Sequence, residues 1–463
     1  MGIAGTAMAS LAGMLKDGGF NITGSDTACY PPMSDYLAGL DIEVMEGFVA
    51  SNLDYHPDLV VVGNVIRAIY DEAQALVDSD IPYCSFPQIL GHLFLKNAHS
   101  VVVAGTHGKT TTTSVAAWLL ESAGLQPGFL IGGVARNFNR TASAGRGTHF
   151  VIEGDEYDTA FFDKGPKFLH YRPRTCILTS VEFDHADIYT DLEHVKSSFF
   201  RLMEILPQDG CLIARTDDPV VAKVSATAQC ECWGYGPGQE WDGSIDSVDT
   251  QAGTMVFSIT RGQKKIGTFE SSLVGTHNLY NQVAAAAAAI RQGATVEQLQ
   301  RGFSTFLGIK RRQEVIGEPR QITVVDDFAH HPTAVKSTIA ALKQRFGDRR
   351  MWVVWEPRSA TSRRNTFQEA YASSFVGADK VVVSLPYDTS SIPEQERFSS
   401  ESLVADLSRQ GVDAKALPNA IAIADFIAEQ ARPQDVIAIF SNGAFDGLHR
   451  RLLGLLATGE SQI

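Results

Sequence analysis

The sequence has no long apolar run, little cysteine and a deficit of positive charge. No stretch reaches the ~18 apolar residues that a membrane-spanning helix needs. The first residues also lack the basic segment and apolar core of a secretory signal. These absences argue against a membrane partner, and we expect a cytoplasmic protein.

The cysteine pattern and the net charge argue against two further classes of protein, those with a cysteine zinc site and those that bind nucleic acid. The six cysteines are scattered, and no second close pair joins Cys230 and Cys232 to complete a zinc site. We therefore expect free thiols in a reducing compartment. The net charge of −14, from 39 basic and 53 acidic residues, is opposite to what a nucleic-acid surface needs. Anionic small substrates stay possible, because a helix N-terminus or one lysine can hold a phosphate locally.

Short apolar runs alternate with helical patterns, and 463 residues suggest about three domains of ~150 residues. Such alternation is typical of parallel sheets with crossover helices, so we expect an α/β fold. Residues 242–273 instead alternate as antiparallel hairpins do. We place the domains at 1–98, 99–309 and 310–463. The expected strands are 59–62, 101–104, 150–152, 175–178, 322–325, 351–355, 380–384 and 436–440, and the expected helices include 9–16, 69–77, 282–290 and 296–303.

The strongest local signal is a glycine loop between an apolar strand and a helix. Residues 101–104 form the strand, residues 105–109 (Gly-Thr-His-Gly-Lys) the loop, and the helix starts at about Thr110. Glycines let backbone N–H groups converge on phosphate oxygens, and the helix dipole adds positive potential there. Lys109 would neutralise phosphates and Thr110 would offer its hydroxyl to Mg²⁺. The loop predicts nucleotide binding but departs from the usual P-loop spacing, which puts its first glycine at Val103.

Acidic side chains follow two more strands. Glu153, Asp155, Glu156 and Asp158 come after strand 150–152, and an acidic run with His185 comes after strand 175–178. Because the carboxyl ends of parallel strands share one sheet edge, these groups should lie beside the glycine loop. Carboxylate oxygens suit Mg²⁺, so the pattern favours a metal site over a solvated acidic loop.

A second glycine pattern opens the chain. Gly2 and Gly5 precede the helix 9–16, while the strand expected before such a loop is almost missing. We therefore expect residue 1 to sit at the end of that strand, with upstream residues absent from this sequence. The pattern also leaves open an NAD-dependent dehydrogenase, although it lacks a third glycine and leaves the Lys109 loop unexplained.

Three further motifs, in this order after Gly-Thr-His-Gly-Lys-Thr-Thr, resemble the Mur ligase family. They are the segments 275–281 (GTHNLYN), 311–314 (RRQE) and 326–332 (DDFAHHP). The resemblance runs over essentially the whole chain and is strongest to the muramate-specific members. It implies a Rossmann-like UDP-N-acetylmuramate-binding domain, a central P-loop ATPase domain and a Rossmann-like C-terminal domain for the peptide substrate.

The resemblance also implies roles for single residues. Lys109, Glu153 and His185 would be catalytic, and Thr110, Glu153 and His185 would hold Mg²⁺. UDP-substrate contacts would come from Gly2, Gly5 and Asp26. Arg358 is either a partner for a peptide carboxylate or a surface arginine. The implied ATP site comprises Gly105, Thr106, His107, Gly108, Lys109, Thr110, Thr111, Asn278, Asn281, Arg312, Asp326 and His331.

The implied reaction is ATP-dependent amide-bond formation through an acyl phosphate, in murein recycling. UDP-N-acetylmuramate, ATP and the tripeptide L-alanyl-γ-D-glutamyl-meso-diaminopimelate would be the substrates. Segment 159–173 favours the tripeptide over single L-alanine, which stays as the alternative amine. Phe199 stands where several family members carry a carbamylated lysine, so we expect no such modification. A non-catalytic ATP-binding module is a further alternative, and the oligomeric state is left open.

Overall fold

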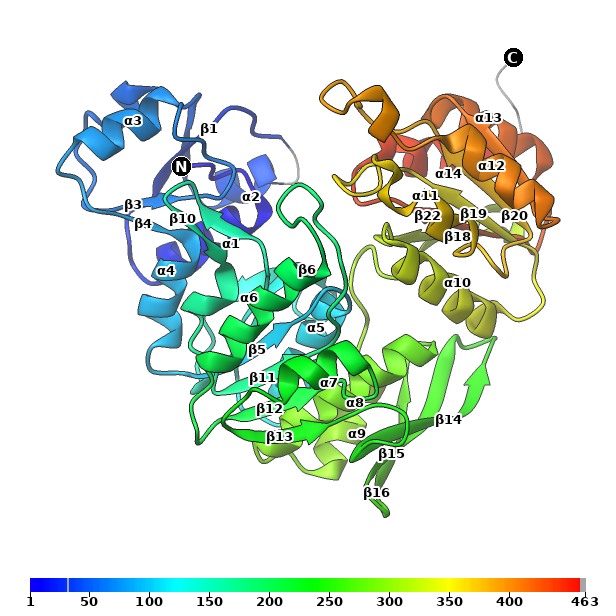
Figure 1. The fold of residues 1–463 in the computed structure, drawn as a ribbon, viewed down its shortest axis with the longest axis horizontal. Coiled ribbons are helices and arrows are strands. Elements are labelled where there is room, and N and C mark those ends of the chain that lie inside the picture. The colour runs from blue at the N-terminus through cyan, green and yellow to red at the C-terminus, as the bar shows by residue number, and fades with distance from the viewer. Residues whose placement is uncertain (31–32, 459–463) are drawn as a thin grey trace.

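The computed structural model describes residues 1–30 and 33–458, which form three α/β bodies. In Figure 1 the N-terminal body lies at the upper left, the C-terminal body at the upper right, and the central body below both. The expected three-domain α/β class is confirmed. Within the described residues, no helix is long and apolar enough to cross a membrane.

The N-terminal body contains two short parallel strand pairs, β1-β2 and β3-β4. Residues 1–3 lie between them: Gly2 N–H donates to Ser25 O (2.8 Å) and Gly63 N–H donates to Met1 O (3.1 Å). The opening residues thus join the pairs into one layer before α1 begins. The elements are α1 (Thr6–Asp17), β1 (Thr23–Asp26), α2 (Met33–Gly39), β2 (Glu43–Glu46), β3 (Val60–Val62), α3 (Asp71–Asp78), β4 (Tyr83–Ser85) and α4 (Phe86–Leu90).

The central body is built on a sheet of order β13-β12-β11-β5-β8-β6-β7, in which β7 is antiparallel to β6. Strand β5 lies between β8 and β11, and all three are parallel. The loops that leave these three strands therefore meet at one edge of the sheet, as expected. The strands are β5 (His99–Ala104), β6 (Gly128–Ala135), β7 (Arg140–Ser143), β8 (His149–Gly154), β11 (Thr175–Leu178), β12 (Cys211–Ala214) and β13 (Glu231–Gly234).

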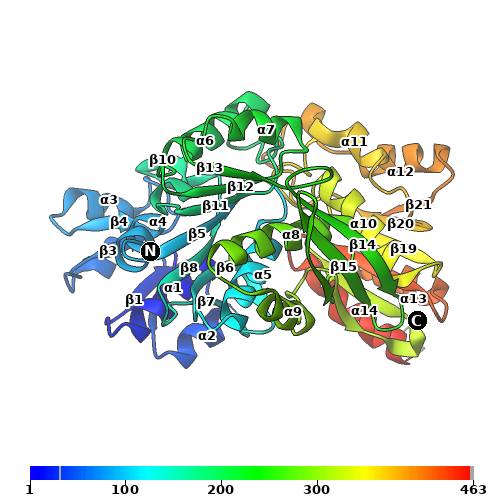
Figure 2. The same cartoon turned by 90° about the horizontal axis from the view of Figure 1, so that it is seen from below.

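Helices cover this sheet, and an antiparallel sheet β14-β15-β16 lies beside it, as the alternation of residues 242–273 predicted (Figure 2). The pair β9-β10 lies in the segment after the acidic run of β8. The elements are α5 (Lys109–Ser122), β9 (Asp158–Ala160), β10 (Asp163–Pro166), α6 (Leu192–Glu204), α7 (Pro219–Ser225), β14 (Trp241–Asp249), β15 (Thr254–Arg261), β16 (Lys264–Ser271), α8 (Thr276–Arg291) and α9 (Val296–Ser304).

The C-terminal body has a sheet of order β17-β18-β22-β19-β20-β21, parallel except for β17. Its central strands are fully buried between two helical layers. The elements are β17 (Glu314–Gly317), β18 (Thr323–Asp327), α10 (Pro332–Phe346), β19 (Met351–Trp355), α11 (Gln368–Ala372), β20 (Lys380–Ser384), α12 (Ser400–Arg409), β21 (Asp413–Leu417), α13 (Ala420–Gln430), β22 (Val436–Phe440) and α14 (Leu448–Thr458).

The alanine run of α8 allows this helix to pack closely in the core that it shares with α5. Ala285 is 0% exposed there, together with Leu119 of α5. A small side chain on α8 leaves room for the helix that carries the glycine loop. Adding methylenes to such a filled space forces neighbouring groups apart.

We predict that Ala285→Leu lowers the free energy of unfolding by about 1–3 kcal/mol, because it overpacks this core. Urea denaturation followed by circular dichroism measures the change. The matched control is Ala457→Leu on the exposed side of α14, for which we expect a change within about 0.5 kcal/mol. Equal stability of both variants would contradict the packing argument.

Candidate active site

A cavity of about 960 Å³ lies where the loops of the central sheet meet the other two bodies. The N-terminal body contributes Thr6 and Ala7, at the start of α1. The C-terminal body contributes residues around the start of α10, and the glycine loop forms part of the wall. A space that is shared by three bodies can hold several substrates in contact.

The glycine loop has the backbone geometry that a phosphate cradle needs. Gly105 and Gly108 adopt positive φ angles of 130° and 81°. A side chain at Gly105 would place its Cβ 2.2 Å from Thr179 Oγ1, and one at Gly108 would lie 2.7 Å from Asn281 Oδ1. Only glycine fits both positions, and α5 begins directly after the loop.

Lys109 is buried at the start of α5 and faces a carboxylate. Its Nζ donates to Glu156 Oε2 at 2.8 Å and to the carbonyl of Gly105 at 2.7 Å. Burial by itself would lower the pKa of Lys109, but Glu156, Asp155 and Glu153 raise it above its ordinary value. The side chain is therefore a fixed positive charge beside the loop.

Thr110 and Glu153 present oxygen atoms next to this charge. The Thr110 hydroxyl donates to Glu153 Oε1 at 2.9 Å, and Gly132 N–H donates to Glu153 Oε2 at 2.7 Å. Burial and Asp155 raise the pKa of Glu153 against the opposing effect of Lys109. A hydroxyl and a buried carboxylate are hard oxygen donors, and a cation would relieve this crowding of negative charge, so the pair fits Mg²⁺.

Glu156 is a residue of this site that the sequence analysis did not single out within its acidic run. It is 2% exposed and lies between Lys109 and His185, with its Oε1 3.6 Å from His185 Nε2. Burial by itself would lower the pKa of His185, but the nearby charges of Glu156 and Asp184 outweigh this and raise it. One carboxylate thus orients two of the predicted catalytic side chains.

Lys167, in segment 159–173, is a further buried charge at this site that no sequence motif indicated. It is buried at the cavity wall, where its Nζ lies 3.2 Å from Asp155 Oδ2 and 4.0 Å from the centre of the Tyr157 ring. No local spacing in segment 159–173 indicates that this lysine is buried. The lysine adds a second positive charge near the carboxylates that follow β8.

Two carboxylates after β11 connect the central body to the C-terminal body. Thr333 at the start of α10 donates to Glu182 Oε2 at 2.6 Å, and Thr361 donates to Asp184 Oδ1 at 2.7 Å. Burial would raise the pKa of Asp184, but His330 and neighbouring histidines hold it well below its ordinary value. These partners are about 150 to 180 residues apart in sequence, which explains why sequence patterns could not pair them.

The cavity brings together part of the predicted ATP set. Asn278, Asn281 and Arg312 line it, and Arg312 donates to the Thr110 hydroxyl at 3.2 Å. Asp326 is not among the residues that line this cavity. Its Oδ2 lies 3.4 Å from Arg311 Nε, and its Oδ1 lies 3.1 Å from His449 Nε2. Its predicted role remains a prediction.

The predicted substrate residues lie on both flanks. Gly5 precedes α1, and Asp26 Oδ2 accepts from Ala4 N–H at 2.9 Å, which fixes the loop that Gly2 opens. The Nη1 atom of Arg358 lies 3.2 Å from Glu356 Oε1, and its guanidinium carbon lies 3.7 Å from the centre of the Tyr387 ring. These contacts orient the half-buried side chain. Its role at a peptide carboxylate remains a prediction.

The site belongs to a three-domain α/β protein of the class that binds nucleoside triphosphates. Its features are a glycine loop after a buried strand, a buried lysine, and acidic residues after two neighbouring strands. Family models match it in the same order: "Mur ligase family, catalytic domain" over residues 1–97, "Mur ligase middle domain" over 103–289, and "Mur ligase, glutamate ligase domain" over 311–443. The chain belongs to the Mur ligase family. It is accordingly an ATP-dependent ligase that forms an amide bond, which excludes the dehydrogenase and the non-catalytic module.

Individual relatives agree with this assignment. The chain is 39% identical to UDP-N-acetylmuramate–L-alanyl-gamma-D-glutamyl-meso-2,6-diaminoheptandioate ligase of Escherichia coli, over 99% of this chain and 97% of that protein. UDP-N-acetylmuramate–L-alanine ligase of Desulforamulus reducens is 31% identical, over 98% of this chain and 96% of that protein. The crystal structure of a murein peptide ligase from Psychrobacter arcticus has a TM-score of 0.72 and 35% identity, and the match covers 100% and 98% of the two chains.

We predict that His277→Gln weakens the loss of stability on acidification. Burial lowers the pKa of His277 to about 4, against about 6.5 in the unfolded chain. Between these values the unfolded state binds more protons, so the stability that neutral His277 permits is lost as pH falls from about 6.5 to 4. Thermal denaturation at pH 7 and pH 5 measures the difference.

The variant should retain on the order of 1 kcal/mol of the stability that the parent protein loses over this interval. His92→Gln, at an exposed histidine, is the control and should follow the parent protein. An identical pH response in His277→Gln and the parent would contradict the predicted neutral state of His277.

Proposed function

We propose that this ligase joins L-alanyl-γ-D-glutamyl-meso-diaminopimelate to UDP-N-acetylmuramate using ATP, in murein recycling. The observation that carries the proposal is the buried Lys109 beside Thr110 and Glu153, at the wall of a cavity that all three bodies share. The choice of amine is supported by the 39% identity to the E. coli tripeptide ligase, against 31% to the D. reducens L-alanine ligase.

ATP would lie with its phosphates in the glycine loop. Backbone N–H groups of residues 105–108 and the start of α5 would bind phosphate oxygens, and Lys109 would neutralise them. Asn278 and Asn281 would lie near the adenine. Thr110, Glu153 and His185 would hold Mg²⁺, which would supply charge stabilisation for the transferring phosphoryl group. Glu156 would keep Lys109 and His185 in position.

The reaction then has two balanced steps. A muramoyl carboxylate oxygen bonds to the γ-phosphorus, and the bond from that phosphorus to the β-phosphate oxygen breaks, which gives an acyl phosphate and ADP. The peptide amine nitrogen then bonds to the acyl carbon, the bond from that carbon to the phosphate oxygen breaks, and the nitrogen loses a proton. Lys109 offsets the repulsion between the carboxylate and the phosphates in the first step.

The flanking bodies would hold the other two substrates. We infer that residues 1–98 hold the UDP part through Gly2, Gly5 and Asp26, and that residues 310–463 hold the peptide, with Arg358 at a carboxylate. The planar fork of arginine suits bidentate binding, and its stacking on Tyr387 keeps it oriented. The contacts of Glu182 and Asp184 with the C-terminal body would help to keep water from the acyl phosphate.

We predict that Lys109→Met lowers the rate of ATP-dependent ligation by about 10²–10³-fold, because a preorganised positive charge at the phosphates is lost. Phosphate release in the presence of all three substrates measures this rate. Lys164→Met is the control: Lys164 is an exposed lysine paired with Asp158, and the variant should keep the parent rate. Ligation at the parent rate by Lys109→Met would disprove the proposed role of the glycine loop.

We predict that the tripeptide supports faster phosphate release than L-alanine at equal concentration, with ATP, Mg²⁺ and UDP-N-acetylmuramate present. The two candidate functions differ only in this amine. Mass spectrometry of the UDP-linked product identifies which amine has been joined. Preferential ligation of L-alanine would replace the proposed function with the alternative one.

A further inference from the structure

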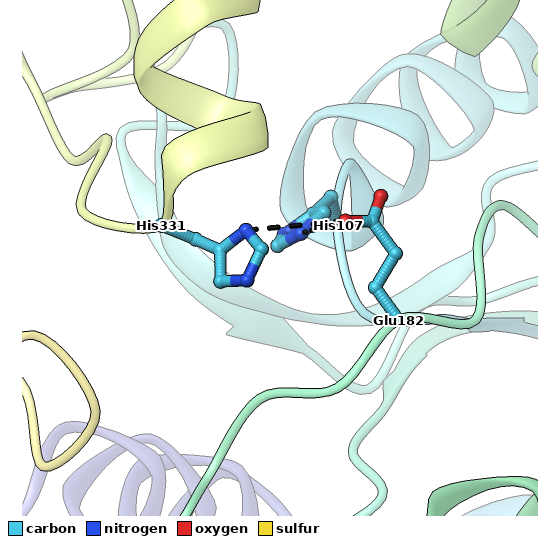
Figure 3. Close-up of side chains that lie close together, drawn as sticks. All are labelled: His107, Glu182 and His331. Atoms are coloured by element: carbon cyan, nitrogen blue, oxygen red, sulfur yellow. Dashed lines mark ion pairs between the residues drawn. The ribbon is translucent and has the colours of Figure 1, made fainter. Parts of the chain in front are cut away.

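Three side chains from distant segments converge beside the glycine loop (Figure 3). His107 belongs to the loop itself, Glu182 follows β11, and His331 immediately precedes α10 in the C-terminal body. Each offers one ligand atom, and these three atoms all lie within 4.8 Å of one another. The cluster therefore spans the contact between two bodies of the molecule.

The individual distances leave room for a small ion between the side chains. His107 Nε2 lies 3.7 Å from Glu182 Oε2, and His331 Nδ1 lies 4.0 Å from the same oxygen. Two ligands of one tetrahedral metal ion are about 3.3 Å apart when each bond is about 2.0–2.1 Å. To close the set around one ion, the two histidine nitrogens would each have to move about 0.4–0.7 Å closer to Glu182 Oε2.

The hydrogen bonding of the cluster is incomplete. His107 Nε2 and His331 Nε2 are buried and have no hydrogen-bond partner among the described residues. His331 is 4% exposed, and its Nδ1 accepts only a long bond of 3.3 Å from Thr333 N–H. Buried polar atoms without partners are costly, so His107 Nε2 points to a missing partner. An ion bound at His331 Nδ1 would replace the long hydrogen bond from Thr333 N–H.

We propose that His107, Glu182 and His331 form a binding site for a divalent transition-metal ion of the Zn²⁺ class. Two imidazoles and one carboxylate are a ligand set that suits zinc and its neighbours, with a fourth position left for water or another ligand. The site is separate from the position at Thr110 and Glu153, whose hydroxyl and carboxylate oxygens suit Mg²⁺.

The surrounding groups support this ligand set. Thr333 donates to Glu182 Oε2 at 2.6 Å and so orients the carboxylate from outside the cluster. The His107 ring packs against the His331 ring, with centroids 4.6 Å apart. A bound ion would connect the glycine loop to the first turn of α10, and it would thereby hold the C-terminal body against the central body.

The test uses the full chain, freed of metal by a chelator and then titrated with Co²⁺ in excess Mg²⁺. Mg²⁺ occupies oxygen-ligand positions, while Co²⁺ reports imidazole coordination through its visible absorption. We expect one equivalent of Co²⁺ to bind, and Zn²⁺ to displace it. We expect this binding to weaken by more than about 100-fold in each of three variants, Glu182→Gln, His107→Asn and His331→Asn. Loss of a group that only hydrogen-bonds to a metal ligand costs ~10–100-fold, so a larger loss identifies a direct ligand.

The variants are chosen to keep the fold. Asparagine at position 331 preserves the N-cap of α10, and circular dichroism verifies the folding of each variant. His185→Asn is the matched control, because it removes an imidazole from the proposed Mg²⁺ position and should leave Co²⁺ binding unchanged. Co²⁺ binding that survives Glu182→Gln and His331→Asn, or that is lost in His185→Asn instead, would overturn the proposal.

Discussion

The buried ion pair between Lys109 and Glu156 is the interaction on which the rest of the site depends. It keeps a positive charge at the start of α5, where the glycine loop opens toward the cavity. Removing one member of a buried pair typically costs about 3–5 kcal/mol, because the other charge is left without a partner. Glu156 also faces His185, so one carboxylate lies beside two of the predicted catalytic side chains.

The carboxylates after β11 extend this arrangement to the C-terminal body. Glu182 and Asp184 accept hydrogen bonds from Thr333 and Thr361, which belong to different parts of that body. The loop after β5 thus carries the positive charge of Lys109, and the loop after the neighbouring strand β11 carries the negative charges of Glu182 and Asp184. This division suits a ligase, which must bind an anionic nucleotide and also bring a second domain over it.

Much of the fold could be predicted from the sequence, because its signals are local. The strands at 175–178, 351–355, 380–384 and 436–440 have the predicted bounds, since buried parallel strands are continuous apolar runs with clear ends. The helix after the glycine loop begins at Lys109, one residue before the predicted start. Residues 1–3 lie between two strand pairs, and the expectation that residue 1 ends a strand remains a prediction.

The candidate site could be predicted only in part. The residues of single motifs, such as Lys109 with Thr110, were found because a short glycine loop must place them together. Lys167 was missed because burial of a lysine depends on Asp155 and Tyr157, and no spacing encodes that contact. The cluster of His107, Glu182 and His331 was missed for the same reason, since its members lie 75 and 149 residues apart in the chain.

The sequence by itself determined the class of the fold, the family and the position of the glycine loop, because strand periodicity and glycine geometry are properties of neighbouring residues. The tertiary structure decided which carboxylate faces Lys109, which histidine faces which acid, and where the bodies touch. Those choices depend on the packing of segments far apart in the chain, and a buried charge is stable only beside the partner that the whole fold provides.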